Sequence, residues 1–286
     1  MRRQRTVLSS GHSCREVIRG GESLALHTWN DGRPDLIDLF YIHGLQSHAG
    51  WLVETGPALL ERGVRLTALD RRGSGLSTGR RGHLDDARLA LDDYASVLAR
   101  VAGAADGPIT VIGQSFGASL LAAMVATGRV PKLTRIVLCA PALGQQRARM
   151  DDVTRDMVLR RGGDGVSVVE IEDEQYTSMP EYLRMMANDA LMVRALTEGF
   201  RAAMVEVENL YVAAGTEPWS SHRVCVALPE RDAIIDQQAS LRMLETLAPH
   251  AQIRKFPTNS HYLEFTAVRA EYWDWLAEVT LADATC

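Results

Sequence analysis

The 286-residue chain lacks the residue patterns that would tie it to a structural metal or a redox couple. Its four cysteines are Cys14, Cys139, Cys225 and Cys286, and no two of them form a C-x-x-C pair, so a zinc site or a redox centre is not expected. Cys139 and Cys225 lie inside apolar runs, and we expect them to pack as small core residues. A catalytic cysteine remains the minor alternative.

Long apolar runs and an excess of basic residues are also missing. No stretch approaches the roughly 20 apolar residues that a membrane-spanning helix needs. The basic start MRRQR is not followed by the apolar segment of a signal peptide. The formal net charge of −5 argues against a nucleic-acid partner. We therefore expect a soluble, cytoplasmic protein that binds no nucleic acid and has no stable membrane insertion.

Short β-branched or apolar runs alternate with longer helical patterns along most of the chain. The runs lie at 23–29, 36–44, 64–70, 109–115, 135–141, 223–230 and 252–257. Helical patterns lie near 50–62, 85–103, 116–128, 236–248 and 267–282. This alternation predicts βαβ units and a mainly parallel sheet. Several runs are apolar throughout, as strands covered on both faces should be.

One interval, 145–219, contains no convincing strand of the central sheet. Its helical patterns predict an insertion over the sheet whose last helix returns to the core. The chain is thereby divided into a core, 1–144 and 220–286, and an inserted segment, 145–219. Met185 and Met186 lie in this segment. They are explained equally well by helix packing and by an adaptable apolar wall above a pocket, and both can hold at once.

The stretch GQSFG, residues 113–117, has the pattern G-x-S-x-G. Glycines flank the serine at a tight strand-to-helix turn because a Cβ there would crowd the neighbouring strand and helix. Such a turn exposes the Ser115 hydroxyl and places the Phe116 N–H at a helix N-terminus, where a developing negative charge is favoured. An ordinary turn serine is the alternative. An apolar run before the pattern and a helical run after it favour a nucleophile.

A serine nucleophile needs a base, which follows it in the chain in this kind of architecture. His261 lies in the loop after the run at 252–257, on the sheet edge where open α/β sheets place their sites. His250 ends a helical pattern and is better explained by the helix dipole. Position and elimination therefore favour His261 as the base.

An acid that orients the base should follow the preceding strand. Asp232 lies in the loop after the run at 223–230, whereas Asp236 stands where the next helix begins and is best read as its N-cap. We therefore assign Asp232 to orient His261. Glu230 and Asp236 remain minor alternatives.

A second donor to a developing oxyanion should come from the loop after an early strand. In LFYIHGLQSH, Gly44 lets the backbone bend toward the site, and the Leu45 N–H is the natural donor. We expect His43 to brace this loop. Gly44 and Gln114, with Met185 and Met186, are our candidates for substrate contact.

Together these motifs resemble the α/β-hydrolase superfamily, and within it the branch of monoacylglycerol lipase and lysophospholipase-like enzymes, which also resembles bacterial serine aminopeptidase-type hydrolases. The motifs are HG at 43–44, DRRGSGLS at 70–77, RRGHLDD at 80–86, GQSFG at 113–117, RD at 231–232 and SH at 260–261. The resemblance runs from about residue 20 to 280. The residue before the nucleophile is usually histidine in this branch and is Gln114 here, which weakens a specific claim of lipase activity.

The resemblance implies a mostly parallel eight-stranded α/β-hydrolase sheet, with helices on both faces and a helical cap inserted after strand 6. It also implies a triad of Ser115, Asp232 and His261, with oxyanion donors at Leu45 and Phe116. It implies no metal and no organic cofactor. The motifs at 70–77 and 80–86 contain four arginines, Arg71, Arg72, Arg80 and Arg81. These form either an anion site or a solvated loop with structural ion pairs, and we favour the latter.

These expectations point to two-step acyl transfer on an ester or thioester, with an acyl-enzyme intermediate and water as the final acceptor. The substrate would be small or carrier-bound, with a medium to large apolar acyl or alcohol part. A pathway-dedicated thioesterase, cyclase or acyltransferase would keep the same triad. Lyase or C–C hydrolase chemistry on the same fold, and a non-catalytic binding protein, are further alternatives.

Overall fold

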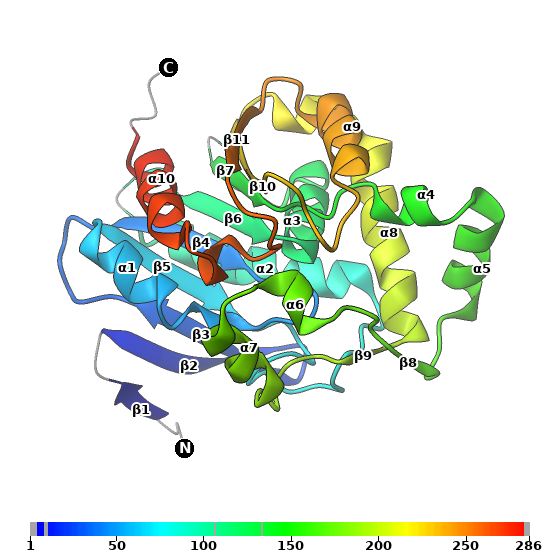
Figure 1. Ribbon diagram of the computed structural model, residues 1–286, viewed down its shortest axis with the longest axis horizontal. Coiled ribbons are helices and arrows are strands. Elements are labelled where there is room, and N and C mark those ends of the chain that lie inside the picture. Colours follow the sequence, from blue (N-terminus) through cyan, green and yellow to red (C-terminus); the bar gives the residue numbers. More distant parts are fainter. Residues whose placement is uncertain (1–4, 9–10, 106, 133, 283–286) are drawn as a thin grey trace.

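A single sheet runs through the computed structural model, which describes residues 5–8, 11–105, 107–132 and 134–282 (Figure 1). Its strand order is β1-β2-β3-β5-β4-β6-β7-β10-β11. The strands are β1 (Arg5–Leu8), β2 (His12–Arg19), β3 (Glu22–Trp29), β4 (Ile37–Ile42), β5 (Val64–Leu69), β6 (Thr110–Gln114), β7 (Arg135–Cys139), β10 (Arg223–Pro229) and β11 (Gln252–Phe256). Every run that the sequence marks as a strand is a strand of this sheet.

The sheet is parallel from β5 to β11 and antiparallel at its other end, where β3 pairs with both β5 and β2. The eight strands from β2 onward form the predicted mostly parallel hydrolase sheet, and β1 adds one antiparallel edge strand. The apolar pattern did not reveal β2 because Val17 is its one buried residue. The fold class is therefore confirmed, with an extra edge strand.

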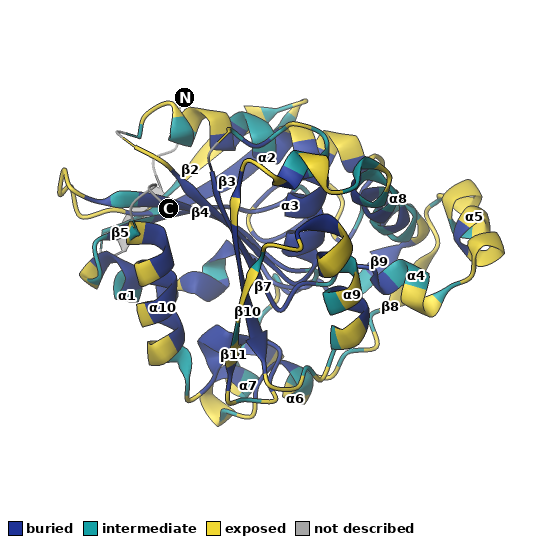
Figure 2. Cartoon of the chain, turned by 90° about the horizontal axis from the view of Figure 1, so that it is seen from above, coloured by how far each residue is buried: buried dark blue, intermediate teal, exposed yellow. Residues whose placement is uncertain are grey.

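Helices cover both faces of the sheet (Figures 1 and 2). The helices outside the 145–219 segment are α1 (Thr55–Glu61), α2 (Ala87–Ala102), α3 (Phe116–Ala126), α9 (Gln237–Leu247) and α10 (Arg269–Leu281), with the short 3-10 helices η1 (Ala49–Leu52) and η3 (Leu263–Phe265). Side chains of α1 and α10 join one apolar cluster with the sheet, and those of α2, α3 and α9 join another. Helix α3 is buried on nearly all sides, so the turn at its start is held by packing from every direction.

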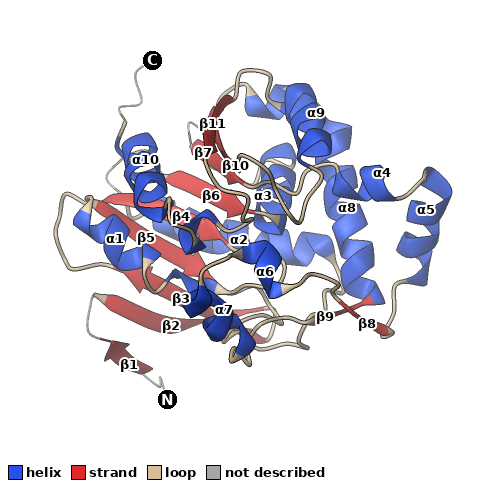
Figure 3. Ribbon diagram, in the orientation of Figure 1, coloured by secondary structure: helices blue, strands red, loops and turns tan. Residues whose placement is uncertain are grey.

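The segment after β7, the sixth strand of the predicted eight, is mainly helical (Figure 3). It contains α4 (Gln145–Arg149), α5 (Asp152–Arg161), α6 (Asp173–Tyr176), α7 (Pro180–Ala187), α8 (Glu198–Ala214) and the short 3-10 helix η2 (Glu217–Trp219). Helix α8 packs against α3, so the last long helix returns to the core. A small hairpin of β8 (Val166–Val168) with β9 (Ala195–Thr197) was not predicted, because three-residue strands carry no readable period.

Cys139 and Cys225 are buried in the core, as the sequence predicts, whereas Cys286 lies outside the described residues. Within the described ranges, no helix has the length and apolar character needed to cross a bilayer. The same ranges contain no cluster of three or more histidine, cysteine or acidic side chains that could hold a metal ion.

A buried ion pair ties β3 to the loops at the end of β5. The Asp70 carboxylate accepts hydrogen bonds from the Ala49 N–H at 2.7 Å and the Leu76 N–H at 2.8 Å, and its Oδ2 lies 3.3 Å from His27 Nε2. Burial alone would lower the pKa of His27, but Asp70 and the neighbouring Cys14 raise it to about 9. Burial alone would raise the pKa of Asp70, but His27 holds it at about 2. The histidine is therefore charged in the folded protein at neutral pH.

His27 should make stability fall with rising pH. Its pKa is higher in the folded chain than the ordinary 6.5, so its contribution is complete below pH 6.5 and is lost as the pH rises through 9. A shift of this size corresponds to about 3 kcal/mol. Urea unfolding should be measured for wild type and for His27→Gln at pH 6 and at pH 9. The difference in unfolding free energy between the two proteins should shrink by about 3 kcal/mol over this range. The control His250→Gln, at an exposed histidine, should keep the wild-type slope. Parallel curves for wild type and His27→Gln would contradict the assignment.

Candidate active site

Ser115 stands in a strained backbone conformation at the turn from β6 to α3. Its φ of 54° and ψ of −118° fall in a region that L-residues rarely adopt. Three backbone hydrogen bonds hold it there. Its N–H donates to the Cys139 carbonyl at 2.9 Å, and its carbonyl accepts from the N–H groups of Ala118 at 3.0 Å and Ala142 at 3.2 Å. The strain is therefore fixed by β7 and the loop after it as well as by α3.

The glycines on either side of Ser115 are required by close backbone contacts. A Cβ on Gly117 would lie 2.0 Å from the Ile42 carbonyl oxygen, and one on Gly113 would lie 2.6 Å from the Ala118 Cα. Gly44 approaches the site as well, since a Cβ there would lie 3.5 Å from the Ser115 Cβ. The steric reason given for the G-x-S-x-G pattern is confirmed.

His261 and Asp232 form a buried pair between the loops that follow β11 and β10. His261 Nδ1 lies 2.7 Å and 3.0 Å from the two carboxylate oxygens of Asp232, and the two side chains are 1% and 0% exposed. Oδ1 also accepts from the N–H groups of Ile234 at 2.8 Å and Ile235 at 3.0 Å. Burial would raise the pKa of Asp232, but the charge and hydrogen bonds of His261, with the two amides, keep it below its usual value.

The tautomer of His261 follows from this pairing. An ionised carboxylate can only accept, so Nδ1 carries the proton and Nε2 presents a lone pair. Nε2 is buried, with no hydrogen-bond partner among the described residues. A buried imidazole nitrogen of this kind is suited to take a proton from a neighbouring hydroxyl.

The other candidates for acid and base lie elsewhere. Asp236 accepts from the Ala239 N–H at 2.9 Å and caps α9, as the sequence predicts. Glu230 is exposed, and His250, also exposed, bonds through Nε2 to the His222 carbonyl at 3.1 Å. Of the weighed acids and bases, the structure pairs Asp232 with His261.

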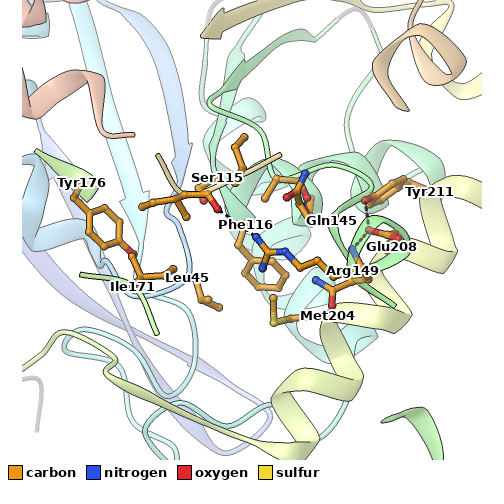
Figure 4. Close-up of a pocket in the computed structure, with 15 residues that line it drawn as sticks. Leu45, Ser115, Phe116, Gln145, Arg149, Ile171, Tyr176, Met204, Glu208 and Tyr211 are labelled. Carbon is orange, nitrogen blue, oxygen red and sulfur yellow. Dashed lines mark hydrogen bonds between the residues drawn. The ribbon is translucent and has the colours of Figure 1, made fainter. Parts of the chain in front are cut away.

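A cavity opens at Ser115 (Figure 4). Its apolar lining comes from Leu45, Phe116, Ala142, Ile171, Met204, Ile234 and Ile235. Its volume is about 60 Å³. The loop after β4, the loop after β10 and the segment that follows β7 border this partly open cavity.

Met185 and Met186 do not line this cavity. They pack in a separate cluster with aromatic side chains, among them Trp51, Tyr182 and Phe265. The apolar side of α7 faces these rings, so the two methionines fill space beside them. The inserted segment instead supplies Ile171 and Met204 to the cavity, which the helical pattern alone did not single out.

Gln114 lies behind the site and does not line the cavity. It is fully buried, and its Nε2 lies 3.5 Å from the His261 carbonyl oxygen, which makes a weak hydrogen bond. The residue that departs from the lipase-like pattern is therefore placed to touch the backbone of His261.

The loop of Gly44 and Leu45 is fastened to Arg71. Arg71 Nη1 donates to the Gly44 carbonyl at 3.2 Å and Nη2 to the Leu45 carbonyl at 2.9 Å. His43 Nε2 accepts from the Arg71 N–H at 3.0 Å, which confirms that His43 braces the loop. A trans peptide places its N–H opposite its carbonyl. Holding the Gly44 carbonyl against Arg71 therefore turns the Leu45 N–H away from the guanidinium.

Arg71 itself differs from the solvated loop arginine that the sequence predicts. It is 2% exposed and forms no ion pair within the described ranges. Its Cζ lies 5.6 Å from the Phe116 ring centroid and 5.3 Å from that of Phe200, within cation–π range. The other three arginines of the group match the structural interpretation. Arg72 pairs with Asp93, Arg80 pairs with Asp164, and Arg81 donates to the Gly75 carbonyl.

Comparisons with known proteins cover most of the chain. The family model Hydrolase_4, described as "Serine aminopeptidase, S33", matches residues 38–265. Phospholipase YtpA of Bacillus subtilis (strain 168) is 23% identical over 235 residues, 78% of this chain and 86% of that protein. An uncharacterized abhydrolase domain-containing protein of Dictyostelium discoideum is 34% identical over 99 residues, 35% of this chain and only 10% of that much longer protein.

One solved structure extends the likeness to the whole fold. A soluble variant of monoglyceride lipase from Saccharomyces cerevisiae, in complex with a substrate analog, has a TM-score of 0.80 over 97% of each chain. Its sequence identity is 13%, so this likeness concerns the fold alone.

Proposed function

The chain belongs to the serine aminopeptidase S33 family of α/β hydrolases, and we propose that it is a serine hydrolase that cleaves an ester or thioester of an apolar acyl group. One observation carries the proposal. A buried His261, held through Nδ1 by Asp232, keeps Nε2 without a partner among the described residues. Its loop follows a strand of the same parallel sheet as the strained Ser115.

The proposed reaction begins with attack of Ser115 Oγ on the substrate carbonyl while His261 Nε2 takes the hydroxyl proton. Asp232 stabilises the imidazolium that forms. His261 then returns the proton to the leaving alcohol or thiol as the carbonyl carbon's bond to it breaks, leaving the acyl group on Ser115. In the second half, a water molecule attacks the acyl carbonyl while His261 takes its proton. The bond to Ser115 Oγ then breaks, Ser115 regains the proton and the acid leaves.

The proposed oxyanion donors are the N–H groups of Leu45 and Phe116. Phe116 is the first residue of α3, where an N–H has no carbonyl partner within the helix. The helix dipole adds favourable charge at that point. A donor of this kind is typically worth on the order of 10²–10³ in rate.

Arg71 acts in this proposal as a positioning residue. It holds both carbonyls of the Gly44–Leu45 loop and leaves the Leu45 N–H for the oxyanion. Its positive charge is buried beside the Phe116 ring without an ion pair among described residues, so it also favours negative charge nearby.

We propose that residues 145–219 form a cap over the site, with Ile171 and Met204 facing the acyl group. A cavity of about 60 Å³ suits a short acyl chain, so the medium to large apolar part expected from the sequence would extend beyond it. The names of two relatives, a phospholipase and a monoglyceride lipase, suggest glycerol esters as first substrates to test.

Ser115→Ala should abolish both hydrolysis of p-nitrophenyl butyrate and labelling by a fluorophosphonate probe, because the attacking oxygen is removed. Ser119→Ala, at the cavity's other serine, should still be labelled. Mass spectrometry of the labelled peptide measures the labelling. A parallel panel of esters and thioesters measures the hydrolysis. Equal labelling of Ser115→Ala and wild type would overturn the proposal. A wild-type chain that binds acyl ligands but takes no label would indicate a binding protein instead.

Arg71→Met should lower kcat by about 10²-fold with little change in KM, since a misplaced Leu45 N–H affects the oxyanion more than the bound ester. Arg71→Lys keeps the charge but loses the paired hydrogen bonds, and its kcat should fall between those of wild type and Arg71→Met. Thermal melts check that both variants fold. A folded Arg71→Met with wild-type kcat would show that Arg71 does not position the loop.

A further inference from the structure

The cavity at Ser115 has a polar side as well as an apolar one (Figure 4). Its polar lining residues include Ser119, Gln145, Gln146, Arg149, Glu208 and Tyr211. Two of these, Arg149 and Glu208, carry formal charge. How each charge is compensated decides what the cavity attracts.

Glu208 is already satisfied by the protein. It is 2% exposed, and its two carboxylate oxygens accept from the N–H groups of Gln146 at 2.9 Å and Arg147 at 2.8 Å. The Tyr211 hydroxyl donates to the same carboxylate at 3.3 Å, and Arg147 Nε lies 3.7 Å from it. The negative charge is therefore used to hold the start of α4.

Two uncharged polar side chains on this side are also engaged. Gln145 bonds through Nε2 to the Asp236 carbonyl at 2.9 Å and through Oε1 to the Asp236 N–H at 2.9 Å. The Ser119 hydroxyl donates to the Ala142 carbonyl at 2.8 Å. Little hydrogen-bonding capacity is left for a ligand in these groups.

Arg149 is the exception. Its guanidinium has five N–H donors, and the structure records one hydrogen bond for it, from Nη2 to the Ile234 carbonyl at 3.2 Å. It forms no ion pair with a described carboxylate. Figure 4 shows the side chain reaching from α4 toward Phe116, inside the cavity lining. Arg149 is exposed, so its remaining N–H groups face solvent at the edge of the cavity. The site thus combines an apolar wall with one cation that is bound to no described carboxylate and is open to an incoming ligand.

We propose that Arg149 binds an anionic oxygen group, a carboxylate or a phosphate, on the substrate, so that the enzyme prefers acidic esters over neutral esters of the same length. This inference rests on the proposed ester hydrolysis. Guanidinium matches both anions through paired N–H···O bonds. Because the Glu208 charge is compensated and Arg149 is not, an anion entering the cavity meets a net attraction.

The anion can belong to the acyl part or to the leaving group, and two substrate pairs separate these cases. The first pair is the mono-p-nitrophenyl ester of adipate against p-nitrophenyl hexanoate. The second is butanoylglycerol phosphate against butanoylglycerol. For each pair, the wild-type kcat/KM of the acidic ester is divided by that of the neutral ester. A higher ratio in the first pair places the anion on the acyl part, and a higher ratio in the second places it on the leaving group.

Arg149→Gln should lower that ratio about tenfold, the lower end expected for loss of a charge-assisted hydrogen bond at a half-open site. Arg149→Lys should keep part of the preference. The matched control is Arg160→Gln, which removes the same charge from another exposed arginine, on α5 and outside the cavity lining, and should keep the wild-type ratio. If Arg149 only ties α4 to the Ile234 loop, Arg149→Gln will lower kcat/KM equally for acidic and neutral esters, which would contradict the inference. An unchanged ratio in both pairs would overturn the inference.

A binding measurement separates this inference from the proposed reaction. In the Ser115→Ala background, calorimetry compares monomethyl adipate and the glycerol phosphate ester with methyl hexanoate and the neutral glycerol ester. Addition of Arg149→Gln should weaken binding of an acidic ligand selectively. Failure of the wild-type chain to hydrolyse any ester would refute the reaction, and equal binding of all ligands by both proteins would refute the role of Arg149.

Discussion

The close packing of the start of α3 against the end of β4 is the constraint on which the site depends. Gly117 lies so near the Ile42 carbonyl that any side chain there would clash, and the chain can turn from β6 into α3 only through the strained backbone of Ser115. The same closeness brings Gly44, which follows β4, against Ser115. Ser115 and the Gly44–Leu45 loop are thus neighbours because two parallel strands and one helix meet at one point.

Around that point the protein compensates each buried charge in a different way. Asp232 is paired with His261 and two backbone amides, which leaves the far nitrogen of the imidazole available. Arg71 donates to two carbonyls, lies against two aromatic rings and interacts with the nearby Asp70 and Tyr94, so its charge persists under the loop that it fastens. Buried charges are costly unless they are paired or hydrogen-bonded, and both of these are.

Much of this arrangement could be predicted from the sequence. Alternating apolar runs and helical patterns marked the parallel strands, and the spacing of Ser115, Asp232 and His261 placed them on loops at one edge of the sheet. The exposed strand β2 and the short hairpin of β8 with β9 could not be predicted, because their residues show no buried face of readable length.

The direction in which individual side chains point could not be predicted from the sequence either. Met185 and Met186 share a helical pattern that suits either an aromatic cluster or a pocket wall, and only packing decides. Arg71 lies in a charged motif that resembles a solvated loop, and its burial depends on Phe200, which comes 129 residues later in the chain. Tertiary contacts of this range leave no local signal in the sequence.

A crystal structure of the chain after reaction with a short alkyl fluorophosphonate would test the proposed site directly. We predict phosphorus bonded to Ser115 Oγ, with one phosphonyl oxygen about 2.7–3.1 Å from both the Leu45 and Phe116 N–H groups. The alkyl group should lie against Ile171 and Met204. A phosphonyl oxygen turned away from both N–H groups, or phosphorus bonded to a different residue, would contradict it.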